Sequence, residues 1–330
     1  RLVPMIDTIY IEEEFASHPR VEVIRRKYPK ASMVAISRYG EVFNRGHQSF
    51  RLQKRRPSLI LARKRGNLLM PAPYGVGAEH NFYFSHVLNC LYDCRYCFLQ
   101  GMYRSAHYVL FVNYEEFQDA MVRKAGEWPK ESICCFSGYD GDSLVLEPIT
   151  GFLESFLPFF SREPRLELEL RTKSVAIRPL LDREAFPGCV VAFSFTPESV
   201  GKILEHGVPA LDERLAAAAK LAARGWRIGL RFDPLVYTKD HEELYRDLFR
   251  KVFEALPSDS IHSVGFGAFR LPRDYFHRMA RLYPEERLFA SPLEEREGMV
   301  SYVLGIEEEM KSACRRMLLE SVPEERLFSY

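Results

Sequence analysis

The stretch from Asn89 to Gln100 reads Asn-Cys-Leu-Tyr-Asp-Cys-Arg-Tyr-Cys-Phe-Leu-Gln and places three cysteines close together. Cys90, Cys94 and Cys97 are separated by three and then by two residues, so their thiolates can converge on one side of a tight loop. Soft thiolate ligands select zinc or iron–sulfur clusters over hard cations. The stretch therefore predicts a metal centre.

Two kinds of metal centre fit three cysteines. A structural zinc ion needs four protein ligands, and the nearest candidate for a fourth ligand is His86, which lies inside a predicted strand. A four-iron, four-sulfur cluster on three cysteines instead leaves one iron open to a small molecule. The residues favour the cluster, with a zinc or purely structural site as the alternative.

From residue 79 onward, short apolar runs alternate with helical patterns, as in parallel sheets joined by crossover helices. The predicted strands cover residues 81–88, 132–136, 166–170, 190–195, 227–232 and 263–266. The predicted helices cover residues 114–125, 150–160, 177–182, 211–224 and 241–256. This order predicts an α/β fold, a partial (β/α)6 barrel with its chemistry at the carboxyl ends of the strands.

The regions on either side of the barrel differ from it in composition. Residues 1–40 are expected to be a mixed leader with a helix over 12–27, and residues 42–78 are basic and end in a Pro/Gly-rich connector at 71–77. The tail after residue 291 is expected to be a charged helical cap. We therefore predict three parts, 1–78, 79–290 and 291–330.

Composition bounds the class of protein. The chain has 330 residues, 47% of them hydrophobic and 28% charged, as in an ordinary globular enzyme. Its seven cysteines are an odd number, which suits a reducing cytoplasm better than a disulfide framework. No apolar run approaches the roughly 18 residues of a membrane helix. We expect a cytoplasmic enzyme with no membrane partner.

The cysteine spacing, together with the aromatic Tyr96 before the last cysteine, resembles the motif of the radical S-adenosylmethionine (SAM) superfamily. The resemblance implies two cofactors, a 4Fe-4S cluster held by Cys90, Cys94 and Cys97 and S-adenosyl-L-methionine bound at the open iron. It also implies a 5′-deoxyadenosyl radical as the reactive species. An electron donor such as flavodoxin or ferredoxin would then be a partner.

A narrower resemblance covers roughly residues 50–290. The segments Arg171-Thr-Lys173, Phe193-Ser194-Phe195 and Leu211-Asp-Glu-Arg214 occur in the order found in spore photoproduct lyase and related DNA repair photolyases. The resemblance implies that Lys173 contacts the SAM carboxylate, where a charge-assisted partner is favourable, and that Ser194 lies near SAM. A surface lysine and an ordinary strand serine are the alternative.

The chain departs from this family after the second predicted strand, where the family carries a hydrogen-donor cysteine. Tyr139 stands at that position and is a candidate replacement donor, or else an aromatic lining the site. Cys134 and Cys135 precede it and are expected to pack in the core. The family's tyrosine after the last cysteine is replaced by Phe98, which leaves Tyr96 as the second candidate catalytic residue.

Polar residues follow the same strand. Ser137 and Asp142 are candidate cofactor-binding residues, with Asp140 and Glu147 near them in sequence. The carboxylates of Asp140, Asp142 and Glu147 would bind the SAM ribose or the substrate. The alternative is a set of solvated loop acids and a helix cap.

Residues 42–78 contain eight Lys and Arg and no acid. Such a segment gives sequence-independent, salt-dependent phosphate contacts if its charges share one face. The candidate nucleic-acid-binding residues are Lys54, Arg55, Arg56, Arg63, Lys64 and Arg65. The alternative is a solvated basic face, or pairing with acids elsewhere in the chain.

These inferences predict a radical SAM enzyme that acts on damaged DNA, similar to spore photoproduct lyase but without the usual donor cysteine. One competitor is a radical SAM enzyme acting on RNA, a peptide or a small metabolite. Another is a non-catalytic iron–sulfur protein that binds nucleic acid.

Overall fold

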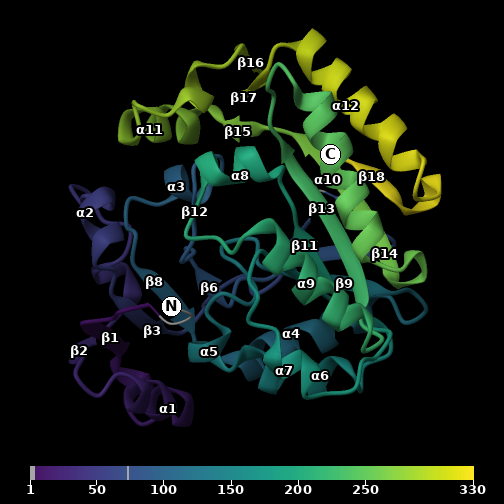
Figure 1. Ribbon diagram of the computed structural model, residues 1–330. Coiled ribbons are helices and arrows are strands. Elements are labelled where there is room, and N and C mark those ends of the chain that lie inside the picture. The colour runs from purple at the N-terminus through teal and green to yellow at the C-terminus, as the bar shows by residue number, and fades with distance from the viewer. Residues whose placement is uncertain (1–3, 73) are drawn as a thin grey trace. The chain divides into compact units, whose positions relative to one another are not determined.

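The computed structural model describes residues 4–72 and 74–330, which form two compact units (Figure 1). Of the described residues, the first unit contains 4–72, 74–91 and 103–170, and the second contains 92–102 and 171–330. The predicted borders after residues 78 and 290 differ from these units, and the three-part division stays a prediction. The first three residues, and Pro73 of the predicted connector, lie outside the described residues.

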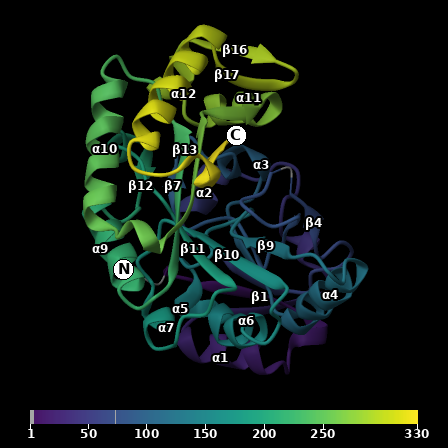
Figure 2. The same cartoon turned by 90° about the vertical axis from the view of Figure 1, so that its right-hand side faces the viewer.

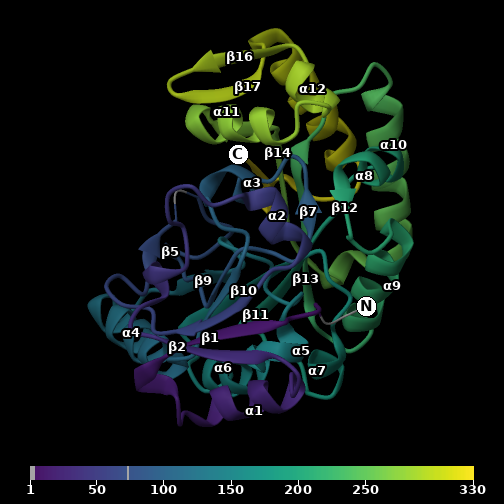
Figure 3. The same ribbon diagram turned by 90° about the vertical axis from the view of Figure 1, so that its left-hand side faces the viewer.

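The leader contains a helix and two strands, and the strands belong to a largely parallel sheet of the first unit. Its strand order is β2-β1-β3-β8-β6, and only β6 runs antiparallel to its neighbour. The strands are β1 Thr8–Glu12, β2 Ser32–Ile36, β3 Leu59–Ala62, β8 Tyr108–Phe111 and β6 Val87–Leu88. Figure 3 shows β1 and β2 side by side, with α1 (Pro19–Lys27) against them.

The helix predicted over 12–27 is therefore correct only in its second half. The alternating run Thr8–Glu12 has the period of a strand, and its β-branched residues favour that conformation. The helix begins at Pro19, a residue suited to the first helical position, and the amide of Arg20 donates to His18 Nδ1 at 3.2 Å.

A second group of strands in the first unit carries the predicted site residue Ser137 and leads into Tyr139. β5 (His80–Tyr83) pairs in parallel with β9 (Ile133–Ser137), and β9 with β10 (Leu166–Thr172). β4 (Met70–Pro71) is antiparallel to β5. The single strand predicted over 81–88 is wrong, because β5 ends at Tyr83 and β6 joins the other sheet. The helices of this unit are α2 Phe50–Arg55, α4 Tyr114–Glu127, α5 Glu147–Thr150 and α6 Phe152–Phe160.

An aromatic core lies between these elements and decides the role of His86. The His86 ring stacks on Phe152 with 3.9 Å between ring centroids, and Phe84 stacks on Phe156 at 5.5 Å. Burial lowers the pKa of His86 to about 3, so this imidazole is neutral. A stacked core histidine does not fit the fourth zinc ligand that the zinc alternative requires.

The second unit contains a parallel sheet in the order β11-β13-β14-β18. Its strands are β11 Cys189–Ser194, β13 Arg227–Leu235, β14 Ile261–Ala268 and β18 Leu327–Ser329. The crossover helix α9 (Leu211–Ala222) is closed by Glu213, whose carboxylate accepts from the amide of Ala210 at 2.8 Å. Gly225 follows the helix with φ +83°, a conformation that favours glycine.

Helices and a hairpin complete the second unit (Figure 2). The helices are α3 Leu99–Met102, α7 Arg178–Leu181, α8 Glu198–Leu204, α10 His241–Ala255, α11 Arg273–Leu282 and α12 Leu304–Leu319. The short strands are β7 Asp93–Cys94, β12 Glu205–His206, β15 Arg270–Pro272, β16 Leu293–Arg296 and β17 Met299–Tyr302. The tail is thus only partly helical, because it also supplies the β16–β17 hairpin and β18. Among the described residues, none of the helices combines the length and apolarity needed to cross a bilayer.

Candidate active site

The cysteine motif makes a tight turn in the second unit. Cys94 lies in β7, which pairs with β12 so that Cys94 is opposite Glu205. The amide of Cys97 donates to the carbonyl of Cys94 at 3.0 Å, which closes the turn. Cys94 is buried and Cys97 half-buried. These contacts bring two of the three predicted ligands into one turn.

Cys90 is the last but one residue of the first unit before the chain crosses to the second. It is half-buried, and its carbonyl accepts from Lys54 Nζ at 3.1 Å. Asn89, before it, has φ +69°, and its side-chain amide donates to the carbonyls of Ser105 and His107 at 2.8 and 2.7 Å. The loop entering the motif is thus fixed by hydrogen bonds within its own unit, while convergence of all three thiolates stays a prediction.

The chemistry of the cysteines fits an iron–sulfur cluster at the motif. No disulfide joins any of the seven cysteines, and the four outside the motif are buried. Burial raises the pKa of Cys135 to about 12 and that of Cys314 to about 12, which keeps these thiols protonated. Since thiolates are the cluster ligands, the half-buried Cys90 and Cys97, with Cys94 between them, are the suitable donors. Cys134 and Cys135 pack in the core as predicted.

Helix α11 anchors the motif turn within the second unit. The Arg95 guanidinium lies 3.7 Å from the ring centroid of Tyr283, and the Tyr283 hydroxyl donates to Gln100 at 3.2 Å. Gly101 of α3 approaches α11 so closely that a Cβ there would lie 2.6 Å from the carbonyl oxygen of Tyr275. A larger residue at Gly101 would push α3 and the turn away from α11.

A buried carboxylate organises the residues around this turn. Glu205 is 7% exposed, and its Oε1 accepts hydrogen bonds from the hydroxyls of Tyr96 and, at 2.8 Å, Thr196. Its Oε2 accepts from Arg214 at 2.8 Å, and Arg214 also donates to the Ser194 carbonyl at 2.8 Å. Glu205 thereby joins the cysteine turn to the ends of β11 and α9.

Lys173 completes this cluster. Its Nζ lies 3.6 Å from Glu205 Oε1 and 5.6 Å from the centroid of the Tyr96 ring. Burial opposes ionisation of Glu205, but Lys173 and Arg214, with the hydroxyl donors, outweigh it and hold the pKa of Glu205 below its ordinary value. Burial and the neighbouring Glu205 raise the pKa of Tyr96 far above its ordinary value, so the phenol stays protonated. The site therefore holds an ionised carboxylate and a fixed ammonium beside the cysteine turn.

In the first unit, Tyr83 and Ser137 end β5 and β9, and Tyr139 follows β9 closely. The ring of Tyr139 stacks on Tyr83 with centroids 4.2 Å apart and planes 23° apart. Ser137 is fully buried, and its hydroxyl pairs with Ser143 Oγ at 2.8 Å and reaches the carbonyl of Glu169 at 3.3 Å. The aromatic pair is thus at the strand edge, whereas the Ser137 hydroxyl makes internal contacts.

The acids that follow β9 have different environments. Asp142 Oδ1 accepts from the amides of Leu144 and Val145, both at 2.9 Å, as in a turn or helix cap. Asp140 is buried and accepts from the Ser85 hydroxyl. Burial raises the pKa of Asp140, against the opposing effect of Ser85 and Lys64. Asp142 thus closes a turn before α5 rather than capping a helix, and both acids are buried rather than solvated, so the alternative of solvated loop acids does not fit them. The predicted role of Asp142 toward a cofactor stays a prediction.

Three of the predicted nucleic-acid-binding residues, Arg56, Arg63 and Arg65, form ion pairs within the first unit. Arg63 pairs with Glu14 at 3.1 Å and with Glu116 at 2.9 Å, Arg65 pairs with Glu12 at 2.9 Å, and Arg56 pairs with Asp7 at 3.1 Å. Of the others, Lys64 Nζ lies 5.4 Å from the ring centroid of Phe111, and Arg55 is exposed. Part of the basic segment thus pairs with acids, as in the second alternative.

Sequence reasoning missed Glu205 and Thr196 and gave no role to Arg214, although the resemblance included that residue. Glu205 lies more than a hundred positions after the cysteines and follows a helix with no recognisable motif. Its role depends on the β7–β12 pairing. Two-residue strands leave no periodic signal, so no pattern in the sequence could have revealed it.

Comparisons with known proteins agree on one family. The sequence profile described as spore photoproduct lyase matches residues 77–311. The spore photoproduct lyase of Bacillus subtilis (strain 168) is 31% identical over 182 residues, covering 54% of this chain and 52% of the relative. That of Geobacillus sp. (strain Y412MC61) is 25% identical over 221 residues, covering 66% and 63%. The chain thus matches between about half and under two thirds of the length of these relatives.

Solved structures of spore photoproduct lyase share the fold. One, a mutant with bound AdoMet and dinucleoside spore photoproduct, is similar with a TM-score of 0.84, covers 98% of each chain and is 20% identical. Another, complexed with dinucleoside spore photoproduct, has a TM-score of 0.83 at the same coverage and identity. The predicted α/β partial barrel is confirmed by this likeness. Because the family profile spans most of the chain, the protein belongs to the spore photoproduct lyase family.

Proposed function

We propose that the protein is a radical SAM enzyme that acts on a lesion in DNA. The observation that carries the proposal is the family match over residues 77–311, which includes the three motif cysteines and Lys173. Cys90, Cys94 and Cys97 would hold a 4Fe-4S cluster. When bound, the cluster and SAM supply a 5′-deoxyadenosyl radical that abstracts a hydrogen atom from the substrate.

Lys173 would bind the SAM carboxylate, and Ser194 would lie near it. The support is the position of Lys173 Nζ, 5.6 Å from the Tyr96 ring between the two cysteines of the turn. Glu205 pairs with this ammonium at 3.6 Å and is therefore a positioning residue for Lys173. A fixed, partly desolvated ammonium is a stronger partner for a carboxylate than a solvated one. Ser137 and Asp142 stay secondary candidates for cofactor contacts.

Tyr139 is the proposed hydrogen donor to the substrate radical. The hydrogen atom would leave the phenol oxygen and bond to the substrate, and a phenoxyl radical would remain on Tyr139. Two observations support it: Tyr139 follows β9 at the carboxyl end of the strands, and its ring stacks on Tyr83. Tyr96 is the other candidate, but its hydroxyl is buried and donates to Glu205.

The relatives are named for the spore photoproduct, so damaged DNA is the substrate class to test first. The ion pairs of Arg56, Arg63 and Arg65 favour a second candidate, in which the same chemistry acts on a substrate without a phosphate backbone. The electron donor would be a small redox protein such as flavodoxin or ferredoxin.

The deciding experiment is anaerobic reconstitution with iron and sulfide, reduction with dithionite, and measurement of 5′-deoxyadenosine with and without a dinucleoside spore photoproduct. We expect SAM cleavage in the wild type, none in Cys94→Ala, and conversion of the photoproduct. In Tyr139→Phe, cleavage should persist while repaired product falls. A loaded cluster that never cleaves SAM would exclude the enzyme, and cleavage without conversion of any lesion would favour the second candidate.

A further inference from the structure

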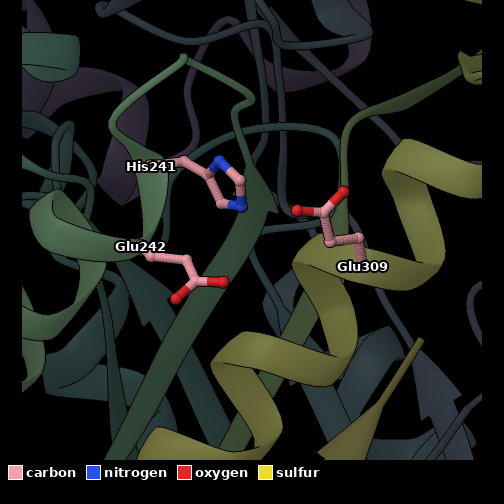
Figure 4. Close-up of side chains that lie close together, drawn as sticks. All are labelled: His241, Glu242 and Glu309. Atoms are coloured by element: carbon pink, nitrogen blue, oxygen red, sulfur yellow. The ribbon is translucent and has the colours of Figure 1, made fainter.

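A histidine and two glutamates converge in the second unit, on elements that the proposed function does not use. His241 and Glu242 begin α10, and Glu309 lies on α12, which packs against it. One ligand atom from each residue lies within 4.8 Å of the others. Figure 4 shows the imidazole and both carboxylates turned toward one shared space. We propose that these residues bind a divalent transition-metal ion.

The orientation and hydrogen bonding of the His241 imidazole suit a metal ligand. Its side chain is buried, with 6% of the residue exposed, and its Nδ1 lies 2.9 Å from the carbonyl oxygen of Thr238. A carbonyl can only accept, so the proton is on Nδ1 and the lone pair is on Nε2. Nε2 is buried and has no hydrogen-bond partner among the described residues. A backbone carbonyl that fixes the tautomer in this way is the usual outer partner of a metal-bound histidine.

An unsatisfied buried nitrogen destabilises a protein unless something binds it. While the imidazole is neutral, the carboxylates of Glu242 and Glu309 cannot be that partner, because a carboxylate and a bare imidazole nitrogen are both acceptors. Neither carboxylate forms an ion pair with a residue that the structure describes. The nearest arginine along α10, Arg246, pairs instead with Glu320 at 3.6 Å. A cation therefore satisfies all three groups together.

The charge and size of the site suit such an ion. Two carboxylates supply two negative charges, whereas the N-terminus of α10 contributes only about half a positive charge against a cation. Metal–ligand bonds of about 2.0–2.2 Å to nitrogen and oxygen place neighbouring ligand atoms roughly 3–4 Å apart. Both glutamates are exposed, so their side chains can close the remaining distance. Imidazole with carboxylates suits zinc, manganese or ferrous iron better than magnesium or calcium.

The test uses protein with its cluster loaded, so that the motif cysteines are occupied, and Co2+ as a spectroscopic probe under anaerobic conditions. We expect one cobalt per chain beyond the cluster iron, with a spectrum free of thiolate bands, displaced by Zn2+ and not by Mg2+. Glu309→Gln should weaken binding by roughly tenfold or more, as loss of support for a metal site does. Because Glu309 is exposed, this variant should fold normally.

The matched control is the double variant Glu243→Gln, Glu308→Gln, which removes two exposed charges from the same helices beside the site. It should keep wild-type affinity, whereas His241→Gln should lose cobalt binding. Zn2+ should also raise the melting temperature of the wild type and of the control but not of Glu309→Gln. The proposal is overturned if Glu309→Gln binds cobalt as tightly as the wild type, if control and variant lose it equally, or if cobalt binds only through thiolates.

Discussion

Glu205 and Glu147 are buried carboxylates, one in each unit, and burial has opposite outcomes for them. Glu205 is 7% exposed and Glu147 is 4% exposed. Glu205 has two cationic partners, Lys173 and Arg214, and its pKa lies below the ordinary value. Glu147 accepts from the backbone amides of Leu153 and Phe152 and from the Thr150 hydroxyl, it forms no ion pair with a described residue, and burial raises its pKa to about 8.

The difference shows that burial alone does not decide whether a carboxyl is charged. A carboxylate removed from water stays ionised where nearby cations replace the lost solvation, and takes up a proton where they do not. Glu205 is the charged centre of the candidate active site. Glu147 is a neutral cap before α6. Each comparison below tests one part of this contrast.

The largest effect is expected for Glu205→Gln. The substitution leaves Arg214 and Lys173 without their buried counter-charge, which is expected to lower the free energy of unfolding by about 3–5 kcal/mol at neutral pH. Because the folded-state pKa of Glu205 is lowered, its stabilisation is full above the ordinary glutamate pKa and is lost as the pH falls through the folded value. The difference in the free energy of unfolding between wild type and variant should therefore become smaller at acidic pH. Urea unfolding at neutral and acidic pH measures it.

Glu198→Gln is the matched control for that experiment. Glu198 lies on α8, shortly before Glu205, but pairs with Lys202 at the surface at 2.7 Å. Little change in stability is expected there. Equal losses in the two variants would mean that the buried network has no special weight.

The second-largest effect comes from Glu147, whose contribution to the free energy of unfolding depends on pH with the opposite sign. The unfolded chain releases this proton near the ordinary pKa and the folded chain only near 8, so stability falls as the pH rises between these values and levels off above 8. Glu147→Gln removes this titration. Between pH 5.5 and 8, the free energy of unfolding of Glu147→Gln should therefore rise relative to that of the wild type by up to about 3 kcal/mol, as measured by urea unfolding. An exposed control, Glu184→Gln, should show no such gain, and parallel curves for Glu147→Gln and wild type would contradict a neutral Glu147.

These contrasts also mark how far sequence reasoning reached. Five of the six barrel strands were predicted to within a few residues, because buried parallel strands are short apolar runs between helical patterns. The strand predicted over 81–88 failed because Phe84, Val87 and Leu88 continue the apolar pattern while the chain passes from one sheet to the other. The leader sheet was missed because its strands are separated by long segments without regular alternation.

The candidate site also contains residues that sequence patterns indicate and residues that only the fold reveals. The cysteines, Lys173 and Ser194 could be named as candidates because they belong to a motif or lie at a strand end, and their roles stay predictions. Glu205 and the ion pairs of the basic segment depend on contacts between residues far apart in sequence, and charge patterning cannot show which acid an arginine will meet. Composition made residues 42–78 look uniformly available, whereas the fold supplies Glu12, Glu14 and Glu116 from other elements.

Glu12 is an intermediate case, a buried carboxylate with one cationic side chain and two backbone donors. It is fully buried, its Oε2 lies 2.9 Å from Arg65, and it accepts from the amides of Tyr39 at 2.9 Å and Arg63 at 3.2 Å. Arg65→Ala should lower the free energy of unfolding by about 1–3 kcal/mol, because a buried acceptor loses its charged donor. Arg26→Ala, which breaks an exposed pair with Glu22, should change it by at most about 0.5 kcal/mol. Similar values for the two variants would place Glu12 with ordinary surface acids.

The smallest effect concerns a basic residue with no such partner. Arg55 is exposed and forms no ion pair with a described residue, so Arg55→Ala should leave stability unchanged. If the segment contacts DNA, the slope of log affinity for undamaged duplex against log salt should fall by about one, since one phosphate contact is lost. Arg65→Ala removes the same charge, but its guanidinium already pairs with Glu12 and Glu14, so its slope should change less. Equal slopes in both variants would mean that ion pairing within the fold does not decide which arginines reach phosphate, and an unchanged slope in both would remove this segment from the DNA-binding surface.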